Sequence, residues 1–178
     1  CGTKLSTSTS ATSFYAYSLS SSSAWITMQH SRVPKLWAKW RAVDTSSTNL
    51  IARFQPAGAT GAVNTTESVG FVYSDATFGD SDIRFQVCVA SSCTNTDTNV
   101  TMSGGVTYDG KVEQTGASSW TWTIRSWTNE GSITTNTGNV TSVNPPTEPI
   151  GPYVLVLTGN TTAKSAVFHR FKVQYETN

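Results

Sequence analysis

Apolar and polar residues alternate along much of the chain, with the period of two that is typical of half-buried β-strands. In residues 119–127, for example, Trp120, Trp122 and Ile124 alternate with polar neighbours. Strands are also expected in other segments: residues 14–19, 25–30, 50–55, 68–74, 83–90, 104–115, 151–159 and 165–176. Residues 25–30 could also extend the first strand, and residues 104–115 carry a turn, so we expect about eight strands.

One segment, SRVPKLWAKWRAV, departs from this period. Pro34 is tolerated in the first turn of a helix, and Leu36, Trp37 and Trp40 fall at helical spacing. The sequence therefore predicts a short helix between the first strands. Residues 128–149 are rich in turn-forming residues and predict a long loop.

These elements predict an all-β fold, an eight-stranded antiparallel jelly-roll sandwich with one or two short helices. An immunoglobulin-like sandwich is less favoured, because the chain lacks the Cys…Trp…Cys spacing of that fold. Residues 1–13 are polar and of low complexity, which predicts a flexible N-terminal arm before a single jelly-roll domain at residues 14–178.

Composition narrows the function classes. Only 13% of the 178 residues are charged and the net charge is +1, so the chain has no global attraction for nucleic acid. No apolar run approaches the roughly 20 residues that span a bilayer, and we expect no membrane partner.

The three cysteines leave two interpretations open. Cys88 and Cys93 could close a local turn in a secreted protein. Reduced thiols in an intracellular product are the preferred interpretation, because an odd number of cysteines does not suit a disulfide framework.

Motifs for catalysis are missing from the sequence. It contains no Gly-x-Ser-x-Gly, His-Glu-x-x-His or phosphate-binding loop, and only two histidines, His30 and His169. His169 lies among phenylalanines in a predicted strand, where a structural role is favoured. We therefore expect that the chain is not an enzyme.

Three aspartates, Asp75, Asp80 and Asp82, directly follow the predicted strand 68–74. Carboxylate oxygens gathered at the end of a strand suit Ca²⁺, which predicts a possible calcium site. The alternative is an ordinary solvated acidic turn.

Four basic residues form a cluster around the predicted helix: Arg32, Lys35, Lys39 and Arg41. They are a third of the 12 Lys and Arg residues and could contact phosphates, although a solvated helix face is an equal alternative. Trp120 and Trp122 could stack on sugar rings, but their alternation with a period of two favours a place in the core.

In chain order, several motifs match a known family: FYAYSL, VPKLWAKW, LIARFQP, SVGFVYSDA, GPYVLVLTG and FHRFKVQYETN. The chain thus resembles the shell domain of coat proteins from small icosahedral positive-strand RNA viruses, most closely those of sobemovirus-like viruses. The similarity extends over most of residues 14–178 in element order, although the middle of the chain contributes little.

The resemblance implies a capsid protein that assembles in many copies into a virion, formed in the host cytoplasm. Genomic RNA would lie on the inner surface, close to the basic cluster. It also implies Ca²⁺ between subunits, held by Asp75 and Asp80 with Asn178 of the C-terminus. The spacing departs from the family's Asp-x-x-Asp, so the choice among Asp75, Asp80 and Asp82 stays open.

Two alternatives remain. The first is a secreted carbohydrate-binding β-sandwich that uses Trp120, Trp122 and Trp127, with Cys88 and Cys93 oxidised. The second is a surface lipoprotein domain, lipidated at Cys1 ahead of a polar tether. The capsid interpretation is preferred because it accounts for a helix between the first strands and for an apolar last strand.

Overall fold

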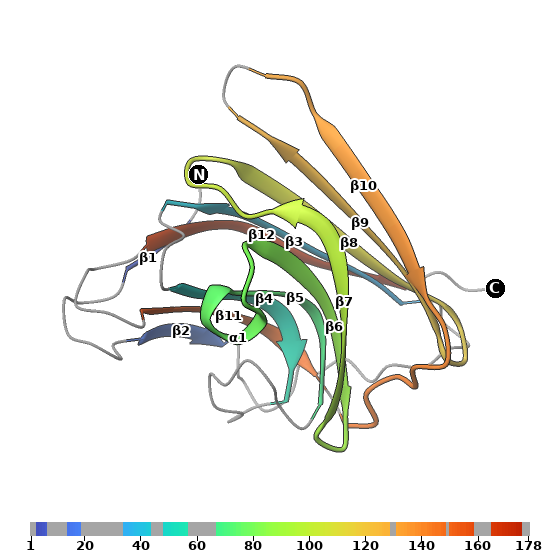
Figure 1. Ribbon diagram of the computed structural model, residues 1–178. Helices are drawn as coiled ribbons and strands as arrows, with labels where there is room; N and C mark the ends of the chain where they lie inside the picture. The colour runs from blue at the N-terminus through green and yellow to red at the C-terminus, as the bar shows by residue number, and fades with distance from the viewer. Residues whose placement is uncertain are drawn as a thin grey trace.

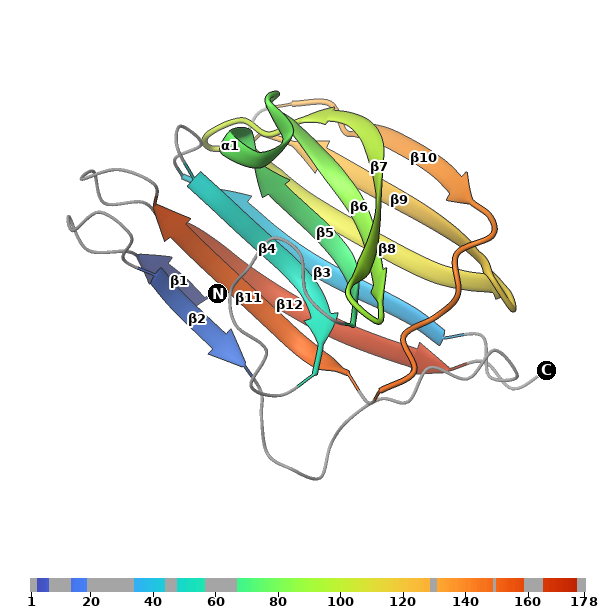
Figure 2. The same cartoon turned by 60° about the horizontal axis from the view of Figure 1, so that its bottom comes forward.

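The computed structural model describes residues 3–6, 14–18, 34–43, 48–56, 67–128, 131–148, 150–158 and 165–175. Within these ranges the chain forms two antiparallel sheets that face each other as two layers (Figure 1). The strands of both layers run in similar directions, as is usual for an aligned β-sandwich (Figure 2). The prediction of an all-β, jelly-roll-like antiparallel sandwich is therefore confirmed.

Each sheet has six strands, and every neighbouring pair is antiparallel. Sheet A has the order β1 (Thr3–Ser6), β12 (Ser165–Tyr175), β3 (Pro34–Ala42), β8 (Thr107–Gly116), β9 (Ser119–Trp127) and β10 (Thr134–Val140). Sheet B has the order β2 (Phe14–Ser18), β11 (Gly151–Thr158), β4 (Thr48–Gln55), β5 (Ser68–Ser74), β6 (Asp82–Val89) and β7 (Ser92–Thr101).

The core lies between the sheets and is built from the inward-facing residues of both. Trp40 of β3 stacks on Tyr108 of β8 with ring centroids 5.7 Å apart, and lies at the same distance from Phe71 of β5 in the opposite sheet. Trp120 and Trp122 are 0% and 5% exposed, which confirms their predicted place in the core. They are therefore not sugar platforms.

The predicted helix around Pro34–Trp40 is wrong, because this segment is strand β3. Leu36, Ala38, Trp40 and Ala42 are all buried and alternate with partly exposed residues, which is the period of a strand. Helical spacing of three apolar residues was a weaker signal than this alternation over nine positions.

Other elements also differ from expectation. Within the described residues there are twelve strands rather than about eight, and the one helix is the four-residue α1 (Asp75–Phe78). Residues 107–116 form one strand without a turn. Strands β7 and β10 occupy segments predicted as non-strand or loop, because their polar residues lack an apolar period. The predicted strand at residues 25–30 lies outside the described ranges.

The expected arm contains a short strand: Thr3–Ser6 pairs with β12 at the edge of sheet A.

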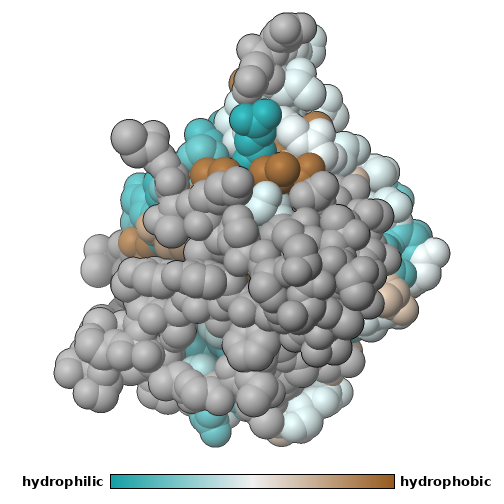
Figure 3. Space-filling model, turned by 90° about the vertical axis from the view of Figure 1, so that its left-hand side faces the viewer, coloured by the Kyte–Doolittle hydropathy of each residue, from teal (hydrophilic) through white to brown (hydrophobic). Residues whose placement is uncertain are grey.

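On the side shown in Figure 3, the described residues that are visible are mostly hydrophilic, with a few hydrophobic residues among them. In the part of the chain that the structure describes, no helix has the length and apolar character needed to cross a membrane.

A candidate carbohydrate-binding face

The outward-facing side of sheet A carries an unusual set of side chains. On β3, the residues that alternate with the buried ones are Lys35, Trp37, Lys39 and Arg41. Strand pairing places charged or hydroxyl side chains of β12, β8 and β9 beside them. We call this surface the basic face and define it by its members: Lys35, Trp37, Lys39, Arg41, Asp109, Lys111, Glu113, Thr121, Thr123, Arg125, Trp127, Arg170 and Lys172.

The register arranges most of these side chains in rows that cross the strands. The Asp109 row runs Arg170, Lys39, Asp109, Arg125 from β12 to β9. The Trp37 row beside it runs Lys172, Trp37, Lys111, Thr123. The Glu113 row follows as Lys35, Glu113, Thr121. Neighbouring strands lie about 4.8 Å apart and rows about 7 Å apart, so the face is an extended two-dimensional array.

The array is strongly positive although the chain is nearly neutral. It holds seven of the chain's 12 Lys and Arg residues but only two of its 11 Asp and Glu residues. The formal excess is five positive charges, against a net charge of +1 for the whole chain. This face therefore attracts anions, and the remainder of the chain carries the balancing negative charge.

Two tryptophans lie among these cations. Lys172 and Lys111 place their ammonium groups 4.8 Å and 5.9 Å from the ring centroid of Trp37. Lys39 lies 4.9 Å from the ring centroid of Trp127. Cation–π contacts of this kind hold the lysine side chains over the aromatic rings while their charge stays at the surface.

The two acidic residues of the face have different surroundings. Glu113 accepts a hydrogen bond of 2.6 Å from Lys111 and lies 3.4 Å from Lys35. Partial burial acts to raise the pKa of Glu113, but the hydrogen bond and charge of Lys111 and the charge of Lys35 outweigh it and lower the pKa. Glu113 is therefore a fully partnered carboxylate.

Asp109 is less well satisfied. Its Oδ2 accepts a long contact of 3.5 Å from Arg170, while its Oδ1 is shielded from solvent and accepts no hydrogen bond within the described residues. Lys39 and Arg125 are its direct neighbours on the two adjacent strands. Oδ2, with only the long contact from Arg170, is thus an acceptor open to a ligand in the middle of the cations.

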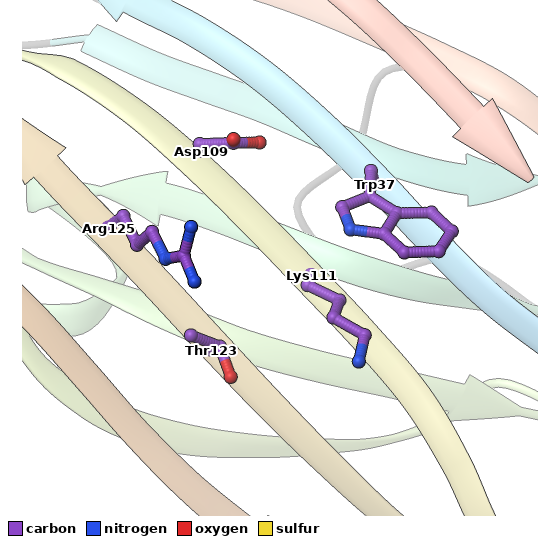
Figure 4. A pocket seen from close by; sticks show the side chains of 5 residues that line it. All are labelled: Trp37, Asp109, Lys111, Thr123 and Arg125. Carbon is purple, nitrogen blue, oxygen red and sulfur yellow. The ribbon is translucent and has the colours of Figure 1, made fainter.

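A pocket of about 200 Å³ opens on the basic face. Figure 4 shows the five side chains that line it, which come from β3, β8 and β9: Trp37, Asp109, Lys111, Thr123 and Arg125. An aromatic ring, a carboxylate, a hydroxyl and two cations therefore converge on one cavity. Pockets that combine an apolar surface with a few polar groups are typical ligand sites.

His169 lies next to this array at a bulge of β12, where the register shifts between Phe168 and Arg170. Its side chain is exposed. Partial burial, followed by the positive charges of Lys39 and Arg41, lowers the pKa of His169 below its ordinary value of 6.5. The lowered pKa favours the neutral imidazole, the form that can accept a proton, at pH 7.

The outward side of sheet B is different. Arg53 of β4 is fully buried there and donates hydrogen bonds to Gln55 and Gln86 at 2.7 Å and 2.8 Å. Burial lowers the pKa of Arg53 to about 10, so the guanidinium stays charged at neutral pH. Because it is closed to solvent, this cluster is part of the packing rather than a binding surface.

The predicted basic cluster was found in part. Lys35, Lys39 and Arg41 gather on the basic face because alternate residues of a strand share a side. Arg32 lies outside the described ranges. Sequence reasoning missed Asp109, Lys111, Arg125, Arg170 and Lys172, since strand pairing over long sequence separations brings them together. The signal was present as alternating charge in residues 107–116 and 165–175.

The predicted calcium ligands have other partners. Asp75 accepts a hydrogen bond from the backbone N–H of Ala76 in α1, and Asp80 forms an ion pair with Arg84. Asp82 accepts a 2.8 Å hydrogen bond from the hydroxyl of Thr101. No three His, Cys, Asp or Glu residues among those the structure describes are grouped to hold a metal, and Asn178 lies outside its ranges. The calcium site stays a prediction.

Cys88 and Cys93 form a disulfide across the turn between β6 and β7. The preferred interpretation of reduced thiols is therefore wrong. The paired residues lie opposite each other at the end of a hairpin, a proximity that counting cysteines does not reveal.

No protein-family model and no curated protein matches the sequence. The fold, however, is similar to that of solved structures. The lectin UEA-II in complex with galactose has a TM-score of 0.55 at 10% identity, over 97% of this chain and 86% of the lectin chain. An endo-β-1,4-glucuronan lyase from the fungus Trichoderma reesei has a TM-score of 0.54 at 10% identity, over 96% and 79%.

A third similar structure is the PL-14 alginate lyase from Aplysia kurodai. Its TM-score is 0.53 at 8% identity, over 92% of this chain and 82% of the lyase chain. At such low identities the likeness concerns the fold.

These findings correct two predictions. The capsid prediction is wrong: the helix that carried much of the resemblance is strand β3, and the fold is shared with two polysaccharide lyases and a lectin. The expectation that the chain is not an enzyme is also overturned, because two of these proteins are enzymes.

Proposed function

We propose that the chain is a carbohydrate-active β-sandwich that binds an acidic polysaccharide, a polymer of uronic acids, across the basic face. The observation that carries this proposal is the array of seven cations and two tryptophans around one pocket of about 200 Å³.

The chemistry of the array suits such a polymer. Guanidinium and ammonium groups bind carboxylates through charge-assisted hydrogen bonds, and arginine does so in a bidentate manner. Aromatic rings offer flat apolar surfaces to sugar rings. Because the cations are repeated along and across four strands, several sugar units can be bound at once, which favours a polymer over a single sugar.

The comparisons support this proposal at the level of fold. Two of the similar structures are lyases of alginate and glucuronan, which are both chains of uronic acids. The third is a lectin with galactose bound. The Cys88–Cys93 disulfide supports placing the chain in an oxidising compartment, outside the cytoplasm.

Binding is tested by isothermal titration calorimetry with alginate oligomers at low salt. We expect saturable binding that weakens steeply as salt is raised, and no binding of a neutral glucan of the same length. Equal affinity for the neutral glucan would contradict the proposal, because the cations would then play no part.

A second candidate function is cleavage of the bound polymer by β-elimination. The observation that favours it is the position of His169 at the bulge of β12, next to Arg170, which pairs with Lys39. A neutral imidazole beside Lys39 and Arg41 could accept the proton from the carbon next to the carboxylate while these cations balance the carboxylate charge. The electron pair would form a carbon–carbon double bond and the glycosidic C–O bond would break, its oxygen taking up a proton.

The unsaturated sugar formed in this reaction absorbs ultraviolet light. We expect alginate incubated with the wild type to gain that absorbance, and the His169→Ala variant to lose the activity. A protein that binds alginate without any gain in absorbance would be a binding module only.

A further inference from the structure

We propose that Asp109 is a specificity-determining residue: it makes the basic face select anionic chains that carry hydroxyl groups beside their charges, and reject chains without such donors. This inference rests on the proposed function and goes beyond it, because cations alone would bind any polyanion.

The place of Asp109 in the array is the first argument. It lies at the centre of the Asp109 row, with Lys39 on one neighbouring strand and Arg125 on the other, and Arg170 further along. It also lines the pocket (Figure 4). A ligand whose anionic groups bind these cations must therefore approach the carboxylate of Asp109.

The second argument is the hydrogen-bonding state of Asp109. Its Oδ1 is shielded from solvent, but the side chain is 22% exposed and its Oδ2 accepts only a long contact of 3.5 Å from Arg170. A carboxylate oxygen with one weak donor has room for a second donor, so a ligand hydroxyl that reaches Oδ2 gains affinity. Glu113, four residues further along the same strand, is satisfied by Lys35 and Lys111 and offers no such gain.

The third argument concerns the ligand. A uronic acid carries hydroxyl groups next to its carboxylate, so its anionic group can bind a cation while a hydroxyl donates to Asp109. Linear polyphosphate carries charge without internal hydroxyl donors, so Asp109 can only repel it. Asp109 thus lowers the affinity for polyphosphate and raises the affinity for a polymer of uronic acids.

The experiment compares Asp109→Ala with Glu113→Ala, since each variant removes one carboxylate from β8. Dissociation constants are measured for the whole chain with alginate oligomers and with linear polyphosphate of similar length, at one salt concentration. Thermal unfolding checks that both variants are folded, and Asp109→Asn serves as a second, nearly isosteric variant.

We expect Glu113→Ala to strengthen binding of both polymers by a similar factor. Asp109→Ala should strengthen polyphosphate binding by that same factor but weaken alginate binding, so that the ratio of the two affinities falls about tenfold. Asp109→Asn, with a neutral acceptor, should change the ratio in the same direction by less.

Each other outcome overturns the inference. If wild type binds alginate but both alanine variants change the two affinities equally, Asp109 acts only through charge, and the proposed function survives alone. If wild type binds polyphosphate better than alginate, or binds neither polymer, then the proposed function and the selectivity both fail.

Discussion

The cations of the basic face differ in whether an acidic side chain already neutralises their charge. Lys35 and Lys111 are tied to Glu113, whereas Arg125 is exposed and forms no ion pair within the described residues. Arg125 also lines the pocket with Lys111. A cation that is not already neutralised gains most from an anionic ligand, so Arg125 should contribute more to binding than Lys35 does.

Replacing Lys111 and Arg125 by glutamine tests the contribution of the pocket cations. We expect the Arg125 substitution to weaken alginate binding by about five- to tenfold, that is by roughly 1 kcal/mol, and the Lys111 substitution to weaken it by less, because Lys111 is already paired with Glu113. Calorimetric titration measures the effect.

Arg84→Gln is the matched control, since Arg84 lies on β6 of the other sheet. It removes the same charge from the molecule and should leave the affinity unchanged within about twofold. An equal loss in this control would mean that net charge, and not the basic face, governs binding.

His169 gives the face a pH dependence. Partial burial and the charges of Lys39 and Arg41 lower its pKa below 6.5, so the folded chain binds fewer protons than the unfolded chain below that pH. Protonation of His169 therefore lowers the free energy of unfolding as the pH falls from 6.5 through the lowered pKa. An anionic ligand favours the imidazolium, so the affinity for alginate should rise as pH falls through this window.

An NMR titration of the His169 ring resonances measures this directly. We expect a midpoint below pH 6.5 in the free protein, a higher midpoint in Lys39→Gln, and a higher midpoint again with alginate oligomer bound. A midpoint that does not respond to the ligand would place His169 outside the binding surface.

At the scale of elements, the sequence predicted strands well where one side is apolar and poorly where both sides are polar. Strands β5, β9 and β12 were found because buried apolar residues define them. Strands β7 and β10 are rich in Thr and Asn, and their place in the fold depends on pairing with β6 and β9. Tertiary pairing of this kind leaves no local hydrophobic signal.

Gly110 of β8 shows how closely the two sheets approach. A Cβ added there would lie 2.3 Å from Cε2 of the buried Phe71 ring in the opposite sheet. We expect Gly110→Ala to lower the free energy of unfolding by about 1–3 kcal/mol, because neither sheet can move away without opening the core. Urea unfolding measures the change.

Two further variants show whether the close approach of Gly110 and Phe71 causes the loss of stability in Gly110→Ala. The double variant Gly110→Ala with Phe71→Leu should lose less than the sum of the single changes, because leucine leaves room for the new methyl group. Gly116→Ala, whose added Cβ meets only Ser119 at 3.1 Å, should have a small effect. Strict additivity of the two single changes would contradict the proposed contact.

At the scale of the whole molecule, the separation of charge is the main functional feature. The chain has a net charge of +1, yet one side of one sheet carries an excess of five positive charges. Composition alone therefore suggested that no strong electrostatic partner exists. Only the strand order, which pairs β3 with both β8 and β12, brings the distant cations together. The sequence contained part of the site in Lys35, Lys39 and Arg41, but not its extent or its Asp109 centre.

The central claim is that the basic face is the ligand-binding surface. The most direct measurement is a ¹H–¹⁵N NMR titration with an alginate oligomer, followed at the backbone amides and tryptophan indoles. We expect shifts concentrated on β3, β8, β9 and β12, with the indole signals of Trp37 and Trp127 among the largest and those of the core Trp120 and Trp122 nearly unmoved. Shifts confined to sheet B, or no saturable shifts at low salt, would contradict the claim.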